Sequence, residues 1–186
     1  MRPIVFDLDG VLVDSEELSW AAWAEVLAPH GVEITAADRA ELTGRTAEAT
    51  HAAFAERAEL PPYDTFADQV GDVVRRALES QLQAFEDAVD TLDVLAGRTP
   101  MAVASSSTRE RLDVSLATTG LGAHFTVTVA GDEVPNGKPA PDLYLAAADR
   151  LGVSPQDCVA VEDAPAGVRA GVAAGMTVVA VERGAF

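Results

Sequence analysis

The chain has 186 residues, of which 48% are hydrophobic, and it carries a formal net charge of −17. This length and apolar content suit one α/β domain with an insert and a proper buried core. The negative charge argues against a nucleic-acid partner, because binding to a phosphate backbone needs a basic surface. No apolar run is long enough to cross a membrane, and the sequence opens on a strand rather than on a signal peptide, so we expect a cytoplasmic protein with no membrane partner.

The first expected strand, residues 3–8, contains the apolar run Ile4-Val5-Phe6 and ends in an acidic turn. Asp7 stands at the carboxyl end of this strand, and Asp9 follows in the turn that Gly10 permits. Open α/β sheets bind their ligands at the carboxyl ends of strands. An isolated Asp-X-Asp in this place usually indicates only an acidic turn, so its meaning depends on what the later strands carry.

Residues 16–82 differ in character from the rest of the chain. They are rich in alanine and follow a helical period, as shown by four apolar residues: Trp20, Trp23, Val26 and Leu27. The burial habits of tryptophan place both indoles in the core of this segment rather than at a substrate site. We predict an all-helical inserted domain, with a hinge where the chain enters and leaves it, near residues 14–15 and 83–85.

Four more strands alternate with helices after the insert. We expect strands at 100–105, 126–130, 158–162 and 177–182, and helices at 107–119, 141–151 and 165–174. Most of these strands are near-continuous apolar runs, as in a parallel sheet that helices cover on both faces. With the strand over residues 3–8, this order predicts a Rossmann-like, doubly wound α/β core formed by residues 1–14 and 84–186.

Polar side chains follow the second strand and precede the second helix of this core. Ser105, Ser106 and Ser107 come after the apolar run that begins at Met101, and serines favour the start of a helix. Lys138 precedes the prolines that open the next helix, and it is the only lysine in the chain, since the other twelve basic residues are arginines. A single retained lysine indicates a place that needs a compact ammonium rather than a planar guanidinium.

Paired carboxylates, Glu162 and Asp163, end the strand over residues 158–162. With Asp7 and Asp9 they form an acidic set that repels a phosphate group unless a metal ion neutralises it. Carboxylate oxygens are suited to Mg²⁺, whereas the three histidines lie outside these motifs and show no spacing typical of zinc ligands. The single cysteine of the chain excludes an internal disulfide and is expected to be an inert core thiol.

In this order, the four segments resemble the sequence pattern of the haloacid dehalogenase-like hydrolase superfamily. DxDG(V/T)LxDSE matches residues 7–16, a serine or threonine after the second strand matches Ser105, KPxPD matches residues 138–142, and EDxxxG matches residues 162–167. The resemblance covers essentially the whole chain. More narrowly, the chain is similar to one branch of this superfamily, which contains phosphatases and β-phosphoglucomutase-like phosphomutases. Members of this branch carry a small helical cap after the first strand. The resemblance implies that residues 15–83 are such a cap.

The resemblance implies a Mg²⁺-dependent phosphatase that forms an aspartyl-phosphate intermediate. Asp7 is then the nucleophile and also a metal ligand. Asp9 is the general acid and base, and its main-chain carbonyl ligates the metal. Asp163 is the third protein ligand, and Glu162 ligates the metal either directly or through a water molecule.

Other residues are expected to contact the phosphoryl group or the rest of the substrate. Ser105 and Lys138 hold the equatorial oxygens of the transferring phosphoryl group, where charge is spread in the transition state. Ser106, Ser107 and Arg109 are candidate substrate contacts at a helix start, where a second anionic group can bind. The alternative for this segment, a simple helix cap, stays open.

One candidate substrate contact lies in the expected cap. The segment Leu42-Thr43-Gly44-Arg45-Thr46 resembles the family's specificity segment, which implies that Arg45 contacts the non-reacting part of the substrate. An ordinary exposed arginine after a helix end is an equally good interpretation, because only Gly44 fixes the local geometry.

Two positions discriminate among the activities of the superfamily. Ser19 stands where β-phosphoglucomutases of this branch carry a histidine, which favours a phosphatase over a mutase. Haloacid dehalogenases proper lack the second aspartate of the first motif and use no metal, so Asp9 argues against them. The leading hypothesis is therefore a phosphatase for a small phosphorylated metabolite, a sugar or sugar-acid phosphate, in a monomer or weak homodimer. A phosphosugar mutase is the runner-up, and a non-catalytic phospho-ligand-binding protein is the third hypothesis.

Overall fold

The computed structural model describes residues 1–43 and 45–183. The chain divides into two compact units, of which one is the insert Glu16–Gln81 and the other combines residues 1–15 with the chain from Leu82 onward. The chain leaves the larger unit after the short strand β2 (Val13–Asp14) and returns to it at the short strand β3 (Gln83–Ala84). These two strands pair in antiparallel register. The hinge expected at these connections stays a prediction.

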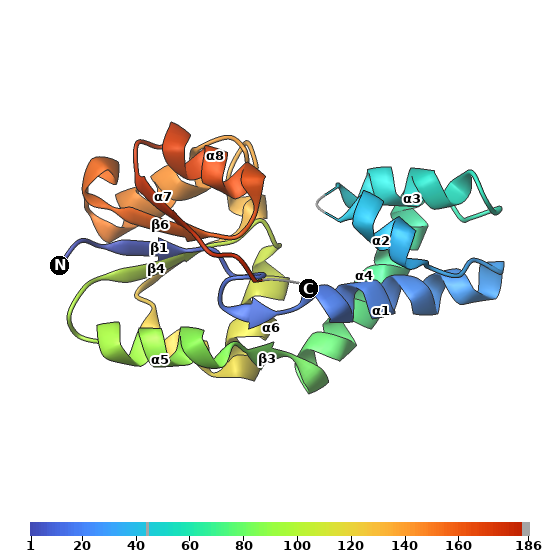
Figure 1. Cartoon of the computed structure of the whole chain (residues 1–186), viewed down its shortest axis with the longest axis horizontal. Coiled ribbons are helices and arrows are strands. Elements are labelled where there is room, and N and C mark those ends of the chain that lie inside the picture. The colour runs from blue at the N-terminus through green and yellow to red at the C-terminus, as the bar shows by residue number, and fades with distance from the viewer. Residues whose placement is uncertain (44, 184–186) are drawn as a thin grey trace. The chain divides into compact units, whose positions relative to one another are not determined.

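A five-stranded parallel sheet forms the centre of the larger unit (Figure 1). Its strands are β1 (Ile4–Phe6), β4 (Met101–Ala104), β5 (Val127–Val129), β6 (Val159–Glu162) and β7 (Thr177–Ala180). Across the sheet the order is β5-β4-β1-β6-β7, so the chain builds outward from β1 first on one side and then on the other. The predicted doubly wound α/β fold is confirmed, and each strand lies within its predicted range.

The register of the three middle strands brings their carboxyl ends to one level. Phe6 of β1 pairs with Val103 of β4 and with Val161 of β6. The residues that follow these partners, among them Asp7 and Glu162, therefore share one edge of the sheet, where doubly wound folds bind ligands.

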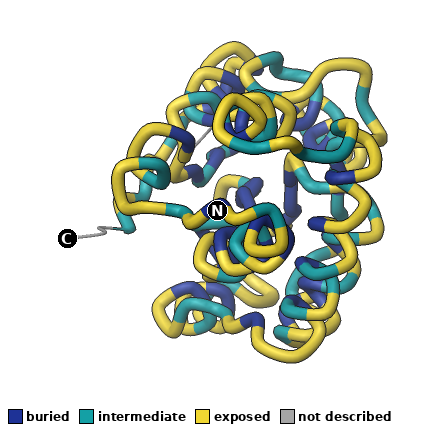
Figure 2. Tube along the Cα trace, turned by 90° about the vertical axis from the view of Figure 1, so that its right-hand side faces the viewer, coloured by how far each residue is buried: buried dark blue, intermediate teal, exposed yellow. Residues whose placement is uncertain are grey.

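Helices cover both faces of the sheet. In Figure 1, α5 (Glu86–Leu95) and α6 (Arg109–Thr119) lie on one face, and α7 (Asp142–Leu151) and α8 (Pro165–Ala173) lie on the other. Figure 2 shows that helical turns are buried on one side and exposed on the other. Most residues of β1 and β4 are buried. Short 3₁₀ turns complete the described chain: η1 (Ala28–His30), η2 (Leu121–His124), η3 (Gly131–Glu133) and η4 (Pro155–Asp157).

Two helices differ from the sequence-based expectation. Helix α6 begins at Arg109 rather than at 107, because the Thr108 side chain accepts a hydrogen bond from the N–H of Arg111 and acts as the N-cap. Helix α5 was not predicted, although Ala88, Val89 and Leu92 have helical spacing and two of them, Ala88 and Leu92, are buried. The acidic residues in its first turn also suit a helix N-terminus.

The described part of the insert consists of helices and turns. The helices are α1 (Glu16–Leu27), α2 (Ala36–Leu42), α3 (Ala47–Ala55) and α4 (Tyr63–Gln81). The Trp23 ring lies 6.1 Å from the ring of Phe54 and 5.3 Å from the ring of Phe66, and Trp20 is buried. The tryptophans thus belong to the core of the insert, as predicted. Among the helices that the structure describes, none combines the length and the apolar character that a membrane span requires.

Candidate active site

Four chain segments meet at the carboxyl edge of the sheet. Asp7 follows β1, Ser105 follows β4, and Glu162 is the last residue of β6, with Asp163 next to it. Lys138 comes from the loop between η3 and α7. The sequence pattern predicted that these residues meet, and the strand register explains why they do.

The Lys138 ammonium connects these segments. Its Nζ lies 2.5 Å from Oδ1 of Asp7 and 2.6 Å from Oε1 of Glu162, and it donates a 3.0 Å hydrogen bond to the carbonyl of Ala104. Burial alone would lower the pKa of Lys138, but the two carboxylates outweigh it and raise the pKa above the ordinary value. Lys138 therefore stays charged, and its three acceptors come from the ends of β1, β4 and β6.

Three carboxyl groups crowd around this ammonium. One carboxylate oxygen from each of Asp7, Glu162 and Asp163 lies within 4.8 Å of the others. Burial raises the pKa of Asp7 to about 7, and the charges of Glu162 and Asp9 act in the same direction, while Lys138 opposes them. Burial and the neighbouring Glu162 also raise the pKa of Asp163. A crowded all-carboxylate set with one resident cation fits a further hard cation such as Mg²⁺.

Two motif glycines leave the space that these carboxylates occupy. A Cβ on Gly10 would lie 2.0 Å from Oδ2 of Asp163, and Gly10 also adopts a φ of 77°. A Cβ on Gly167 would lie 1.8 Å from Oε1 of Glu162. Any side chain at either position would displace a carboxylate, which explains why glycine stands at both.

The Asp9 carboxylate has a separate set of partners. It accepts hydrogen bonds from the hydroxyl groups of Ser15 and Ser107, the latter at 3.0 Å, and its Oδ1 lies 3.3 Å from Nη2 of Arg111. The carboxylate is not part of the cluster formed by Asp7 and its neighbours. The expected role of Asp9 as a metal ligand therefore depends on its main-chain carbonyl alone.

The serine segment after β4 packs closely against the loop after β5. Ser105 is fully buried, and its Oγ accepts a 3.0 Å hydrogen bond from the N–H of Ser107. The N–H of Gly131 donates to the carbonyl of Ser107, and a Cβ on Gly131 would lie only 2.3 Å from the carbonyl oxygen of Ser106. Ser106 itself is exposed. Gly131 thus permits a backbone contact between the loops that carry Ser105 and Lys138.

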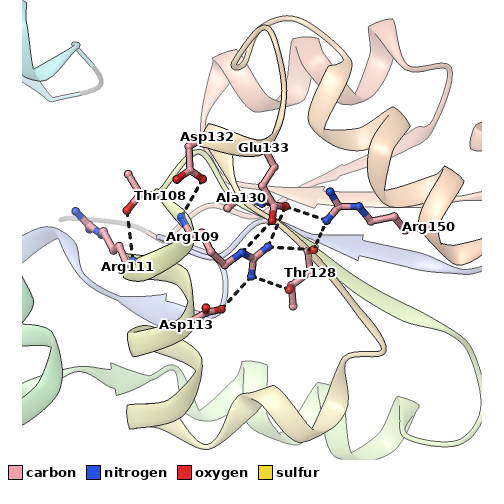
Figure 3. A network of polar contacts seen from close by, with 9 residues as sticks. All are labelled: Thr108, Arg109, Arg111, Asp113, Thr128, Ala130, Asp132, Glu133 and Arg150. Carbon is pink, nitrogen blue, oxygen red and sulfur yellow. Dashed lines mark hydrogen bonds and ion pairs between the residues drawn. The ribbon is translucent and has the colours of Figure 1, made fainter.

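Arg109 takes part in a polar network rather than in the cluster around Lys138 (Figure 3). Its guanidinium donates to both carboxylate oxygens of Glu133, to Asp113, and to the hydroxyl and carbonyl of Thr128. Arg109 is the first residue of α6, and its backbone N–H donates to the carboxylate of Asp132 in η3. Acidic side chains and Thr128 thus engage all three nitrogens of its guanidinium. The expected role of Arg109 as a substrate contact stays a prediction.

Arg45 lies in the insert, where its guanidinium is 3.2 Å from Oε1 of Glu41, four positions earlier in the chain. Both side chains are largely exposed, so this contact contributes little to stability. Gly44, which was expected to fix the local geometry, lies outside the described residues. The role of Arg45 as a substrate contact stays a prediction.

Two residues at the site were not anticipated. Arg111 reaches Asp9 from the first turn of α6. Tyr144, in the first turn of α7, donates its hydroxyl to Oε1 of Glu162 at 2.6 Å. For Arg111 no sequence signal was available. Tyr144 stands two positions after the end of the KPxPD motif, and only its burial in the fold reveals this contact.

The arrangement agrees with comparisons to known proteins. The family model for haloacid dehalogenase-like hydrolases matches residues 4–181. The chain belongs to this family. The predicted resemblance is thus confirmed.

Similar proteins support the enzyme class. The chain is 36% identical to fructose-1-phosphate phosphatase YqaB of Escherichia coli K12, over 96% of this chain and 95% of that protein. It is 35% identical to hexitol phosphatase A of the same organism, over 97% of this chain and 82% of that protein. A HAD family hydrolase from Deinococcus radiodurans R1, solved with bound phosphate and sodium, shares 36% identity and a TM-score of 0.78, over 96% and 79% of the two chains. The expected class, a phosphoric monoester hydrolase, is confirmed at this level.

Glu133 should contribute stability that depends on pH. Hydrogen bonds, first of all from Arg109, lower the pKa of Glu133 to about 2. The contribution is complete above about pH 4.5 and is lost as the pH falls toward 2, because the folded state then has to take up the proton. After a discount for partial exposure, we expect Glu133→Gln to lower the free energy of unfolding by about 1–2 kcal/mol at pH 7.

The Glu133→Gln difference should shrink between pH 5 and pH 2 in urea unfolding followed by circular dichroism. Glu182→Gln, a change at an exposed position of the same unit, is the control and should show no such trend. A Glu133→Gln difference that stays constant over this range would contradict the assignment.

Asp7 should have the opposite dependence on pH in the metal-free protein. Its raised pKa means that the folded state holds a proton which the unfolded chain releases near pH 4, so stability falls as the pH rises from about 4 to 7. Asp7→Asn removes this effect. In calorimetry with a chelator, we expect the variant to be more stable than the wild type by about 1–2 kcal/mol at pH 8 and to lose this advantage at pH 4. Lower stability of the variant at pH 8 would contradict the expectation.

Proposed function

We propose that the protein is a Mg²⁺-dependent phosphatase that hydrolyses phosphate esters of small sugars through an aspartyl-phosphate intermediate. The observation that carries this proposal is the buried Lys138 ammonium, 2.5 Å from Asp7 and 2.6 Å from Glu162, with Asp163 beside them. A carboxylate next to a fixed cation and a hard-metal ligand set is suited to attack at phosphorus. Positioning and electrostatic stabilisation supply most of the catalysis in phosphoryl transfer.

Asp7 is the proposed nucleophile. A carboxylate oxygen of Asp7 forms a bond to phosphorus as the ester oxygen leaves, and hydrolysis of the acyl phosphate then regenerates the carboxylate. Lys138 stays protonated and neutralises charge on the phosphoryl oxygens. Ser105 adds its hydroxyl group as a donor at the end of β4.

Asp9 is the proposed general acid and base. It gives a proton to the leaving oxygen in the first half-reaction and takes one from water in the second. Its contacts with the hydroxyl groups of Ser15 and Ser107 fix the position from which the carboxylate acts. In this proposal Ser107 orients Asp9, which differs from the substrate contact expected from the sequence.

Asp7, Asp163 and the main-chain carbonyl of Asp9 are the proposed protein ligands of Mg²⁺. When bound, the ion would neutralise the crowded carboxylates and the phosphate charge, so that an anionic substrate can approach an anionic nucleophile. The three carboxylates Asp7, Glu162 and Asp163, which lie within 4.8 Å of one another, support this proposal, and burial together with the charge of Glu162 raises the pKa values of Asp7 and Asp163.

The proposed substrates are small phosphorylated sugars, since the similar proteins include phosphatases named for fructose 1-phosphate and for hexitols. We also propose that the insert Glu16–Gln81 serves as the cap that selects the substrate, with Arg45 as a contact. Ser19 in place of the mutase histidine supports hydrolysis over isomerisation. The cytoplasmic location and the monomeric or weakly dimeric state stay predictions.

A phosphate-release screen tests the proposal directly. With MgCl₂ present, we expect turnover of several sugar phosphates, loss of turnover in EDTA with recovery on adding Mg²⁺, and no turnover by Asp7→Asn. Asp87→Asn changes an exposed aspartate and is the matched control. Phosphate release by Asp7→Asn at a tenth of the wild-type rate would exclude Asp7 as the nucleophile. Binding without turnover would favour the non-catalytic protein, and conversion of β-glucose 1-phosphate into glucose 6-phosphate faster than phosphate release would favour the mutase.

The role of Asp9 predicts a dependence on the leaving group. Asp9→Asn should slow turnover of a sugar phosphate by roughly 10²–10⁴-fold, the usual contribution of general acid–base catalysis. An activated aryl phosphate needs no proton on its leaving group, so rapid-mixing measurements should show formation of the phospho-enzyme much less affected than its hydrolysis. Equal losses with good and poor leaving groups would mean that Asp9 does not transfer the proton.

A further inference from the structure

Tyr144 contacts two residues of the proposed active site but has no role in the chemistry described above. It is fully buried in the first turn of α7. Its hydroxyl donates to Oε1 of Glu162 at 2.6 Å, and its ring centroid lies 5.2 Å from Nζ of Lys138. One side chain thus contacts both members of the Glu162–Lys138 ion pair.

Protein groups surround the Glu162 carboxylate. Its Oε1 takes the Tyr144 hydroxyl and the Lys138 ammonium, and its Oε2 accepts from the N–H of Ala164 at 3.4 Å. Gly167 closes another side, where no Cβ would fit. Glu162 is 1% exposed, whereas the neighbouring Asp163 is exposed. These contacts direct Glu162 toward Lys138 and leave Asp163 the more accessible of the two carboxylates.

We propose that Tyr144 is a positioning residue that acts through Glu162 to hold the Lys138 ammonium beside Asp7. In this arrangement Glu162 serves the lysine and is not a direct metal ligand. The inference rests on the proposed function, in which Lys138 contacts the phosphoryl group, and it assigns to that site a residue outside the four sequence motifs.

The hydroxyl group of Tyr144 is the part that matters. It is fully buried and donates to Oε1 of Glu162 at 2.6 Å. Without the hydroxyl, Lys138 would be the only side chain in contact with Oε1 among the described residues. The ammonium would then be drawn toward Glu162, at the expense of its contacts with Asp7 and phosphate. A hydrogen bond to a charged group contributes more free energy than one between neutral groups. We therefore expect its loss to change the Kd for phosphate about tenfold.

Tyr144→Phe tests the inference, because it keeps the buried ring and removes only the hydroxyl. The chain contains one other tyrosine, Tyr63 in the insert, so Tyr63→Phe is the matched control. Calorimetric titration with inorganic phosphate in MgCl₂ needs no turnover and no known substrate. We expect the Kd for phosphate to rise about tenfold in Tyr144→Phe and to stay within twofold in Tyr63→Phe. The Kd for Mg²⁺ alone should stay within twofold in both variants.

Kinetics separate positioning from a purely structural role. A smaller folded fraction would lower the apparent kcat and leave KM and the Kd for phosphate unchanged. A displaced lysine, in contrast, raises KM and the Kd for phosphate. In the Glu162→Gln background, Tyr144→Phe should have less than a twofold further effect on phosphate binding, because the group through which it acts is already altered.

Three results would overturn the inference: unchanged phosphate binding in Tyr144→Phe, weaker binding of Mg²⁺ alone, or an equal effect with and without Glu162→Gln. Failure of the wild-type protein to bind phosphate would instead overturn the proposed function and the inference with it.

Discussion

The arrangement of the site depends on one buried ammonium. Lys138 is held by carboxylates at the ends of β1 and β6 and by a carbonyl at the end of β4, so three strands share a single cation. Such a charge is tolerated away from water only because every acceptor around it is fixed. Burial, together with the charges of Glu162 and Asp9, raises the pKa of Asp7 although Lys138 opposes it, and the crowded carboxylates can accept a metal ion.

Close backbone packing sets the positions of these charges. Glycines stand where a methyl group would meet a carboxylate, as at Gly10 and Gly167, or where two loops cross, as at Gly131. Arg109 and Glu133 hold the same two loops from outside the cluster, since α6, η3 and α7 meet in their network (Figure 3). The positions of the few charged groups thus depend on close packing of the backbone around them.

Arg109 and Lys138 occupy two different kinds of polar site in the larger unit. Arg109 forms several hydrogen bonds at once in the network around Glu133, which the planar guanidinium can do and an ammonium cannot. At the centre of the site a compact ammonium fits between two carboxylates, and the chain uses its single lysine there. The unusual frequency of arginine therefore made Lys138 visible in the sequence.

The sequence by itself determined the elements that depend on local patterns. Apolar runs marked the five strands. Four short motifs marked the site residues Asp7, Asp9, Ser105, Lys138 and the pair that begins at Glu162. Helix α5 was overlooked although its apolar spacing was present.

Only the tertiary structure decided which side chains face one another. Arg109 and Arg111 stand two positions apart on α6, yet one binds Glu133 and the other reaches Asp9. Tyr144 contacts Glu162 because α7 packs against the sheet, and residues 18 positions apart in the chain meet there. Local sequence specifies the conformation of a segment, whereas these contacts depend on strand register and helix packing, which involve the whole fold.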